Sequence, residues 1–143
     1  MEKLTFRVAR EGDEQKILDF ILALAKYEKM ESDVVATPQL LHEWIFEKKK
    51  AEVIFPMVEG KEIGFALFFH NFSTFLGRAG LYLEDLFILE EYRGRGYAQR
   101  LVRYCVNRIL ENGKTAVLTT HETNKAMIQA AQRAGFEIKK TEK

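Results

Sequence analysis

The sequence contains little cysteine and little excess charge. Cys105 is the single cysteine among 143 residues, which excludes an internal disulfide and a metal site built from clustered cysteines, and it fits a reducing compartment. Lys and Arg number 22 against 21 Asp and Glu, so the chain lacks the basic excess that is typical of nucleic-acid binding. The histidines show no metal-ligand spacing. We therefore expect no metal site and no nucleic-acid partner, and we interpret Cys105 as a core thiol.

Long apolar runs and linker composition are also absent. No stretch of about 18 apolar residues occurs, and Glu2, Lys3 and Arg7 interrupt the apolar residues near the start, so we expect neither a membrane-spanning segment nor a secretory signal. No internal repeat and no Pro-rich or Ser-rich linker divides the chain, which has only two prolines. With 47% hydrophobic residues, the sequence predicts one cytoplasmic domain over residues 1–143 with its own core.

Apolar periodicity predicts an α+β fold, with a mixed, mostly antiparallel sheet of about six strands flanked by about four helices. Thr37 and Pro38 form a cap and a first-turn proline, and the helix that they start is expected to place Trp44 in the core. Gly60 indicates a tight hairpin, and the strand-helix-strand order from 80 to 120 indicates one parallel crossover. The predicted strands cover about 4–9, 51–58, 62–69, 78–89, 115–121 and 136–141, and the predicted helices about 13–29, 37–45, 97–111 and 124–134.

The stretch EEYRGRGYAQRLV, residues 90–102, carries the strongest functional signal. Gly94 and Gly96 lie between a predicted strand and a predicted helix, where backbone N–H groups without an obstructing Cβ can bind an anion at the positive end of the helix. Arg93 and Arg95 add positive charge beside them. The stretch predicts a phosphate or pyrophosphate site, with the alternative that the glycines serve only the turn and the arginines are solvated.

Residues 93–98, RGRGYA, are similar to the Arg/Gln-x-x-Gly-x-Gly/Ala signature of the GNAT superfamily of N-acetyltransferases. Residues 22–31, LALAKYEKME, and residues 81–88, LYLEDLFI, resemble segments of its spermidine/spermine (diamine) N-acetyltransferase branch. The resemblance covers nearly the whole chain in the expected order. It implies a GNAT fold, acetyl-CoA as cosubstrate, and a homodimer, since the family is often dimeric.

The resemblance also assigns the cofactor contacts. In that family the pyrophosphate of coenzyme A binds the amides of the glycine turn, and the pantetheine arm pairs with the preceding strand as an additional strand. A bulge or splay in that strand would leave N–H and C=O groups free for this pairing. Asn124 resembles an asparagine that contacts the cofactor, and it is equally interpreted as a helix cap. The implied residues are the main chain of Leu86, Phe87 and Ile88, the turn residues Arg93, Gly94, Arg95, Gly96, Tyr97, Ala98 and Gln99, and Asn124.

Glu84 is the candidate catalytic base. A protonated primary amine must lose a proton before it attacks a thioester, and a carboxylate reached directly or through water is the expected acceptor. Glu84 interrupts an apolar strand, where a charge is costly unless it opens into a cleft, and the resemblance places the family's water-linked base there. The alternative is a carboxylate at a solvated strand edge. Asp85 should face the other side of the strand unless a bulge intervenes, and the N–H of Leu86 or its neighbour would donate to the oxyanion.

The sequence departs from the family at the general acid. Diamine acetyltransferases carry a tyrosine in the last helix that protonates the leaving thiolate, and counting from Asn124 places Ala131 at that position. Water or Tyr97 could take its place. The departure equally allows a chain that binds acyl-CoA with weak catalysis or none.

The remaining candidates concern the acceptor. Tyr27 and Glu28 resemble residues beside the amine site of the diamine branch, with a solvated helix end as the alternative, and Phe75 and Asp85 complete the substrate-binding set. We predict transfer of acetyl from acetyl-CoA to a primary amine of a small molecule, such as a polyamine, a diamine or a lysine-like compound, by direct attack in a ternary complex. The alternatives are an acyl-CoA-binding or sensing module, and a protein lysine or N-terminal acetyltransferase.

Overall fold

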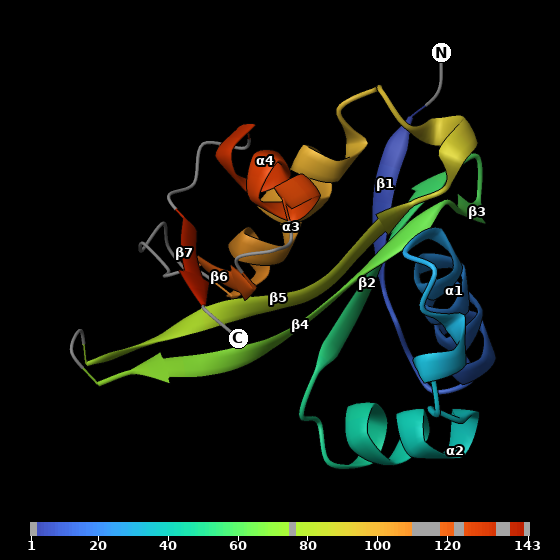
Figure 1. Ribbon diagram of the computed structural model, residues 1–143, viewed down its shortest axis with the longest axis horizontal. Coiled ribbons are helices and arrows are strands. Elements are labelled where there is room, and N and C mark those ends of the chain that lie inside the picture. Colours follow the sequence, from blue (N-terminus) through green and yellow to red (C-terminus); the bar gives the residue numbers. More distant parts are fainter. Residues whose placement is uncertain (1–2, 75–76, 110–117, 122–124, 134–137, 142–143) are drawn as a thin grey trace.

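The computed structural model describes residues 3–74, 77–109, 118–121, 125–133 and 138–141. These residues form a mixed sheet with helices on both faces (Figure 1), which confirms the predicted α+β class. The strands are β1 Leu4–Val8, β2 Glu52–Val58, β3 Lys61–Glu62, β4 Gly64–Ser73, β5 Arg78–Ile88, β6 Leu118–His121 and β7 Ile138–Thr141. The helices are α1 Glu14–Tyr27, α2 Pro38–Leu41, α3 Tyr97–Ile109 and α4 Lys125–Arg133, with shorter helical segments at Glu31–Asp33, His42–Glu47 and Glu90–Tyr92.

The order of the strands follows the chain, apart from the two-residue β3, which pairs only with β2 among the described strands. The path is β1-β2-β4-β5-β6-β7. The pairs from β1 to β5 are antiparallel, whereas β6 runs parallel to both β5 and β7. The predicted antiparallel segment and the crossover from β5 to β6 are confirmed, and the second parallel pair, β6 with β7, was not anticipated. Helices α3 and α4 cover one face of the sheet and α1 and α2 the other (Figure 1).

Each face of the sheet buries its own apolar cluster. The cluster beneath α3 and α4 contains Leu101, Cys105 and Ala131, whose side chains have no exposed surface. The cluster beneath α1 contains Ile17 and Phe55, which are equally enclosed. Burial also raises the pKa of the Cys105 thiol, so this residue is a core thiol, as the sequence predicted.

The hairpin expected at Gly60 is present. Val58 pairs with Lys61, so only Glu59 and Gly60 form the loop. Both have positive φ angles, 51° at Glu59 and 76° at Gly60. Two consecutive residues of this kind are typical of a two-residue turn whose twist matches the strands that it joins.

The predicted position of Trp44 is wrong. Thr37 caps α2 as expected, because its Oγ1 accepts a hydrogen bond from the Leu40 N–H. After four residues, however, the helix continues as a π-helix over His42–Glu47. The wider winding changes which side chains face inward, and Trp44 is 47% exposed. Its ring lies beneath the Lys48 ammonium, 4.1 Å from the ring centroid.

Candidate active site

Glu84 is the extra residue of a β-bulge in β5. The pairing of β4 with β5 joins Leu67 to Asp85 and Phe68 to Leu83, so Glu84 has no partner opposite it. Such a bulge bends a strand and redirects its side chains. Glu84 is exposed and Asp85 is half-buried. The irregularity that the sequence hypothesis required in this strand is therefore present.

The bulge decides which face of the sheet each side chain joins. Leu83 before it and Leu86 and Ile88 after it all pack with the cluster beneath α3 and α4. In a regular strand residues 83 and 86 would point to opposite faces. Asp85 and Phe87 consequently lie on the α1 face, where Phe87 belongs to the second cluster. The bulge thus brings a carboxylate to the α1 face while the leucines of β5 stay in the core.

Beyond the bulge, β5 has a free edge. Within the described residues β6 pairs with β5 only at Leu81 and Tyr82, so the two strands separate before residue 84. The Ile88 carbonyl points to this open side, since it accepts a hydrogen bond from a side chain outside the sheet. Backbone groups alternate along a strand, so Leu86 directs its N–H and C=O to the same side. An extended ligand could pair here as an added strand.

The glycine turn leads directly into α3. Gly94 and Gly96 have φ angles of 80° and 78°, a region that side chains with a Cβ rarely adopt. Helix α3 begins at Tyr97, and the Arg100 N–H bonds the Gly96 carbonyl at 3.3 Å. The N–H groups of its first turn have no partner within the helix. The predicted arrangement of strand, glycine turn and helix is confirmed, and it has the features of an anion site.

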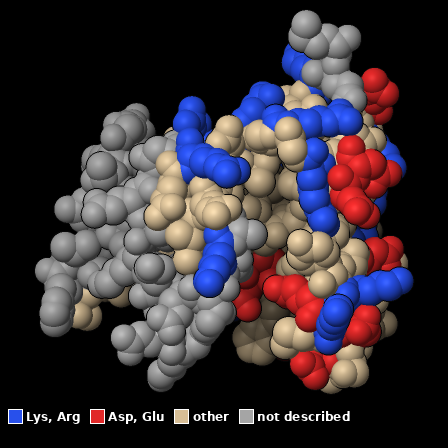
Figure 2. All heavy atoms as spheres, turned by 45° about the horizontal axis from the view of Figure 1, so that its top comes forward, with Lys and Arg blue, Asp and Glu red and all other residues tan. Residues whose placement is uncertain are grey.

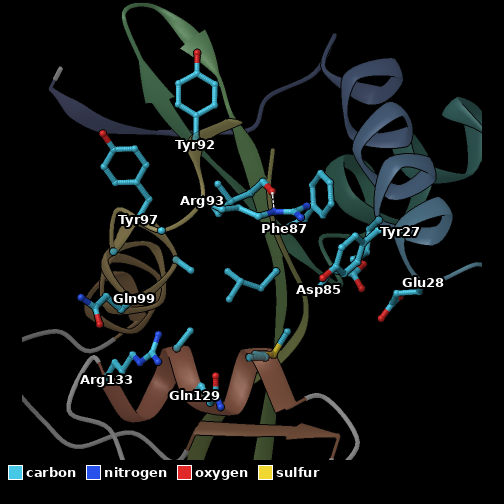
Figure 3. Close-up of a pocket in the computed structure, with 18 of the residues that line it drawn as sticks. Tyr27, Glu28, Asp85, Phe87, Tyr92, Arg93, Tyr97, Gln99, Gln129 and Arg133 are labelled. Carbon is cyan, nitrogen blue, oxygen red and sulfur yellow. Dashed lines mark hydrogen bonds between the residues drawn. The ribbon is translucent and has the colours of Figure 1, made fainter. Parts of the chain in front are cut away.

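The side chains of Arg93 and Arg95, which the sequence predicted to add positive charge beside the glycines, contact carbonyl groups and aromatic rings instead. Arg93 Nε donates a 2.7 Å hydrogen bond to the Ile88 carbonyl, and its guanidinium lies 4.6 Å from the ring centroid of Tyr27 and 5.2 Å from that of Phe87. Figure 3 shows this side chain extending away from Tyr97 and toward α1. Arg95 donates to the Glu91 carbonyl at 3.2 Å and lies over the Tyr92 ring. Phosphate binding at the turn would therefore rest on its main chain.

A cavity of about 540 Å³ joins these features. Its volume lies within the range of small-molecule sites. On the face shown in Figure 2, acidic side chains gather at one side of a hollow and basic side chains at another. The cavity contains most of the residues that the sequence singled out, namely Tyr27, Glu28, Glu84, Asp85, Leu86, Phe87, Ile88, Arg93, Gly94, Gly96, Tyr97, Ala98 and Gln99.

Asp85 is the carboxylate with the most perturbed environment among the described carboxylates. The pKa of its carboxyl group is raised from 3.8 to about 7, mainly by burial and in addition by the negative charges of Glu84 and Glu28. Glu84 and Glu28 thus both lie within electrostatic reach of Asp85 at one end of the cavity. Such a cluster favours a cation, because a bound positive charge would relieve their mutual repulsion.

The candidates for the general acid lie away from these carboxylates. Ala131, at the position of the family's tyrosine, has no exposed surface and packs in the core beneath α3 and α4. Tyr97 lines the cavity, but Figure 3 shows the hydroxyl groups of Tyr97 and Tyr92 pointing away from Asp85. The side chain of Tyr27 instead lies beside Asp85 in that view.

Some functional candidates were missed, and others are not described. Phe75 and Asn124 lie outside the described residues. Gln129 and Arg133 are four apart on α4, and this spacing places them on one side of a helix. The four-residue spacing alone does not predict that this side of α4 faces a cavity. The lining residues that the sequence did not indicate are Leu24, Tyr92, Met127, Gln129, Ala130 and Arg133.

The described part of the chain contains no group of three or more His, Cys, Asp and Glu side chains placed to hold a metal ion. It also contains no helix with the length and apolar character needed to cross a bilayer.

Comparison with known proteins connects this site to a family. The profile described as the Acetyltransferase (GNAT) family matches residues 18–136. Thialysine N-epsilon-acetyltransferase of Bos taurus is 30% identical over 122 residues, which cover 79% of this chain and 71% of that protein. L-ornithine N5-acetyltransferase of Arabidopsis thaliana is 38% identical over 50 residues, which cover 35% of this chain and 22% of that protein.

Solved structures show the same fold. An aminoglycoside acetyltransferase from an uncultured soil metagenomic sample, crystallised with sisomicin, superimposes with a TM-score of 0.76 at 14% identity, covering 98% of this chain and 93% of that one. A ribosomal-protein-alanine N-acetyltransferase from Brucella melitensis gives a TM-score of 0.73 at 15% identity, covering 99% and 97%. The glycine turn before α3, the splayed fifth strand and the family match across most of the sequence agree, and the chain therefore belongs to the GNAT family of acetyl-CoA-dependent N-acetyltransferases.

Proposed function

We propose that this protein transfers the acetyl group of acetyl-CoA to the primary amine of a small molecule by direct attack in a ternary complex. The observation that carries the proposal is that one cavity connects the glycine turn with the carboxylates at the bulge. An anion site and a cation site thus lie at two ends of one space. The names of the thialysine and ornithine acetyltransferases agree with a small amine as acceptor.

The residues fit coenzyme A on the face of the sheet that α3 and α4 cover. The main chain from Gly94 to Gln99 would hold the diphosphate at the start of α3, where N–H groups are unpaired within the helix. Arg133 of α4 lines the same cavity and would add a positive charge. The N–H and C=O groups of Leu86 and the N–H of Ile88, on the open edge of β5, would pair with the amide groups of the pantetheine arm, whereas the Ile88 carbonyl already accepts from Arg93. When bound, acetyl-CoA supplies the acetyl group as a thioester.

The acceptor would bind on the α1 face. Asp85, Glu28 and Glu84 would attract an ammonium group, and Tyr27 and Leu24 would form the wall beside it. The cation would lower the raised pKa of Asp85, because an opposite charge favours the ionised form of a carboxyl group. Binding of the acceptor would therefore release protons from this site.

Glu84 would then accept a proton from the ammonium group through water, as the sequence suggested. The amine nitrogen forms a bond to the carbonyl carbon, the bond from that carbon to sulfur breaks, and the sulfur leaves with its electron pair. The nitrogen loses its second proton to water as the amide forms, and this proton balances the one that the thiolate takes up. The Leu86 N–H, on the open edge of β5, would donate to the carbonyl oxygen as that oxygen gains negative charge. Because Ala131 is enclosed in the core and the Tyr97 hydroxyl points away from Asp85, we propose that water donates the proton to the thiolate.

The test is thiol release from acetyl-CoA over a panel of diamines, lysine analogues, aminoglycosides and peptides. We expect turnover with at least one small primary amine, and calorimetry should show coenzyme A binding that weakens in a Gly96→Ala variant. Binding of acetyl-CoA without turnover for any amine would support the acyl-CoA-sensing alternative instead. Turnover restricted to peptides would support a protein acetyltransferase.

The role of Glu84 has its own test in the pH dependence of the rate. Glu84→Gln should lower kcat at neutral pH and lower it less at high pH, where more of the amine is already neutral. Equal losses at both pH values would remove Glu84 as the base. If Asp85→Asn rather than Glu84→Gln shows a loss that recovers at high pH, the base is Asp85.

The expected homodimer is also a proposal. It rests on the resemblance to a family that is often dimeric. Light scattering should give twice the 16.6 kDa mass of the chain, and a monomer at micromolar concentration would contradict it.

A further inference from the structure

Arg93 lies on the acceptor side of the sheet, although it belongs to the glycine-turn motif. Its guanidinium packs over Phe87, whose side chain is in the cluster beneath α1, and over Tyr27 of α1 itself. Helices α3 and α4, which border the proposed coenzyme A site, cover the opposite face. Figure 3 shows the guanidinium on the Tyr27 side of β5, with Tyr97 and the start of α3 on the other. The Arg93 side chain therefore lies on the acceptor side of the sheet and not beside the proposed coenzyme A site, although its backbone belongs to the glycine turn.

The side chain is held firmly and leaves donors available. Nε is fixed by the 2.7 Å bond to the Ile88 carbonyl, and the two aromatic rings hold the guanidinium plane. Among the described residues no acceptor lies within hydrogen-bond distance of its two terminal nitrogens, Nη1 and Nη2. The residue is exposed and lines the cavity. A guanidinium with two free donors on one edge fits the two oxygens of a carboxylate.

The part of the cavity on the α1 face, here called the acceptor compartment, also contains the acidic residues Asp85 and Glu28. Asp85 lies on the α1 face of β5, two residues before Phe87, over whose ring the Arg93 guanidinium packs, and two residues along a strand correspond to about 7 Å. Glu28 lies at the end of α1 and is close enough to raise the pKa of Asp85. Tyr27 contacts Arg93 and lies beside Asp85. The compartment therefore has a negative end at Asp85 and a positive end at Arg93.

We infer that Arg93 is a specificity-determining residue that binds a carboxylate of the acceptor, and that the acceptors are ω-amino acids rather than diamines or polyamines. The inference rests on the proposed function and names the substrate class of the same site. An ω-amino acid carries an ammonium group at one end and a carboxylate at the other, which matches the two ends of the compartment. A diamine of the same length would place its second ammonium group against the Arg93 guanidinium, and this repulsion selects against it.

The experiment compares acceptors that differ by one carboxylate. L-ornithine is measured against putrescine, and L-lysine against cadaverine. A charge-assisted, two-donor contact at an exposed site should favour each amino acid over its diamine by about ten-fold or more in kcat/KM. Arg93→Gln keeps a donor for the Ile88 carbonyl and removes the charge. In this variant the preference should disappear because the amino acid loses affinity, while KM for acetyl-CoA changes little.

Two controls separate this role from other roles of an arginine. Arg100→Gln removes an exposed arginine of α3 that is not among the residues lining the cavity, and it should keep the wild-type preference. Arg93→Lys keeps the charge but not the planar fork, so it should restore part of the preference that Arg93→Gln loses.

The inference is overturned if the wild-type protein prefers the diamines. It is equally overturned if Arg93→Gln raises KM for acetyl-CoA and lowers kcat/KM of both members of each pair to the same extent, which would make Arg93 a coenzyme A contact. Calorimetry of L-ornithine and putrescine, with coenzyme A present, gives the same comparison without turnover. If no small primary amine of the wider panel is acetylated, the proposed function fails, and the binding preference for L-ornithine over putrescine and its loss in Arg93→Gln still decide the role of Arg93.

Discussion

Asp85→Asn should stabilise the folded protein at neutral and alkaline pH, although it removes a residue of the candidate active site. In the folded state burial raises the pKa of the Asp85 carboxyl from 3.8 to about 7, and Glu84 and Glu28 contribute to the rise. The folded protein therefore holds a proton between pH 4 and 7 that the unfolded chain has released. Stability depends on this difference in bound protons, and it falls as pH rises through that window.

The magnitude follows from the size of the shift. From 3.8 to about 7 is roughly 3 pKa units, and each unit corresponds to about 1.4 kcal/mol, so ionised Asp85 costs the folded state on the order of 4 kcal/mol above pH 7. Below pH 4 the carboxyl group is protonated in both states and the cost is absent. An asparagine resembles the protonated carboxyl group in shape and never ionises. The free energy of unfolding of Asp85→Asn, relative to that of the wild type, should therefore rise by about 1.4 kcal/mol per pH unit between pH 4 and 7. Above pH 7 the difference should stay constant.

Urea denaturation at pH 5, 6, 7 and 8, with both proteins measured at each pH, tests this prediction. Taking the difference at each pH removes the contributions of titrating groups that do not interact with Asp85. Asp33→Asn, at an exposed carboxylate of the segment Glu31–Asp33, serves as the matched control and should show a small difference that does not widen with pH. A constant difference between Asp85→Asn and the wild type from pH 5 to pH 8 would refute the reasoning, as would a loss of stability at pH 8.

Two further predictions concern the same strand. KM for the amine acceptor should fall as pH rises through about 7, because Asp85 must ionise to bind an ammonium group. Glu84→Gln removes a like charge, so it should move the midpoint of this pH dependence of KM to lower pH. An unchanged midpoint would disprove the electrostatic interaction between Glu84 and Asp85. Gly64→Ala should be strongly destabilising, because an added Cβ would lie 2.0 Å from the Phe87 carbonyl oxygen and would force β4 away from β5. We expect the Tm to fall by about 10 °C or more, and a fall of only 1 or 2 °C in calorimetry would contradict the close approach of these strands.

The sequence predicted the elements of the fold well, because periodicity and turn chemistry are local. The apolar repeat of the segment from Glu14 to Tyr27 and the cap at Thr37 depend on residues within a few positions of each other. Trp44 was misplaced for the opposite reason. The π-helical winding that exposes it leaves no distinct mark in the pattern of apolar residues.

The candidate site was predictable only in part. Two glycines between a strand and a helix indicate an anion site from spacing alone, and the resemblance to the GNAT family added Glu84 and the cosubstrate. The orientation of Arg93 was not predictable, since it depends on Phe87 and on Tyr27, which is 66 positions earlier in the chain. Gln129 and Arg133 were missed because a helix pattern does not say which partly polar side meets a cavity.

What the sequence determined by itself is the inventory: which segments are strands and helices, where the chain turns, and which side chains could do chemistry. These follow from interactions between residues near each other along the chain. The tertiary structure alone decided that Glu84 is a bulge residue, that Asp85 turns to the α1 face with its pKa raised to about 7, and that Arg93 stands on that face as well. Register between strands and burial of a charge depend on distant segments that meet only when the sheet has formed, and no local pattern contains them.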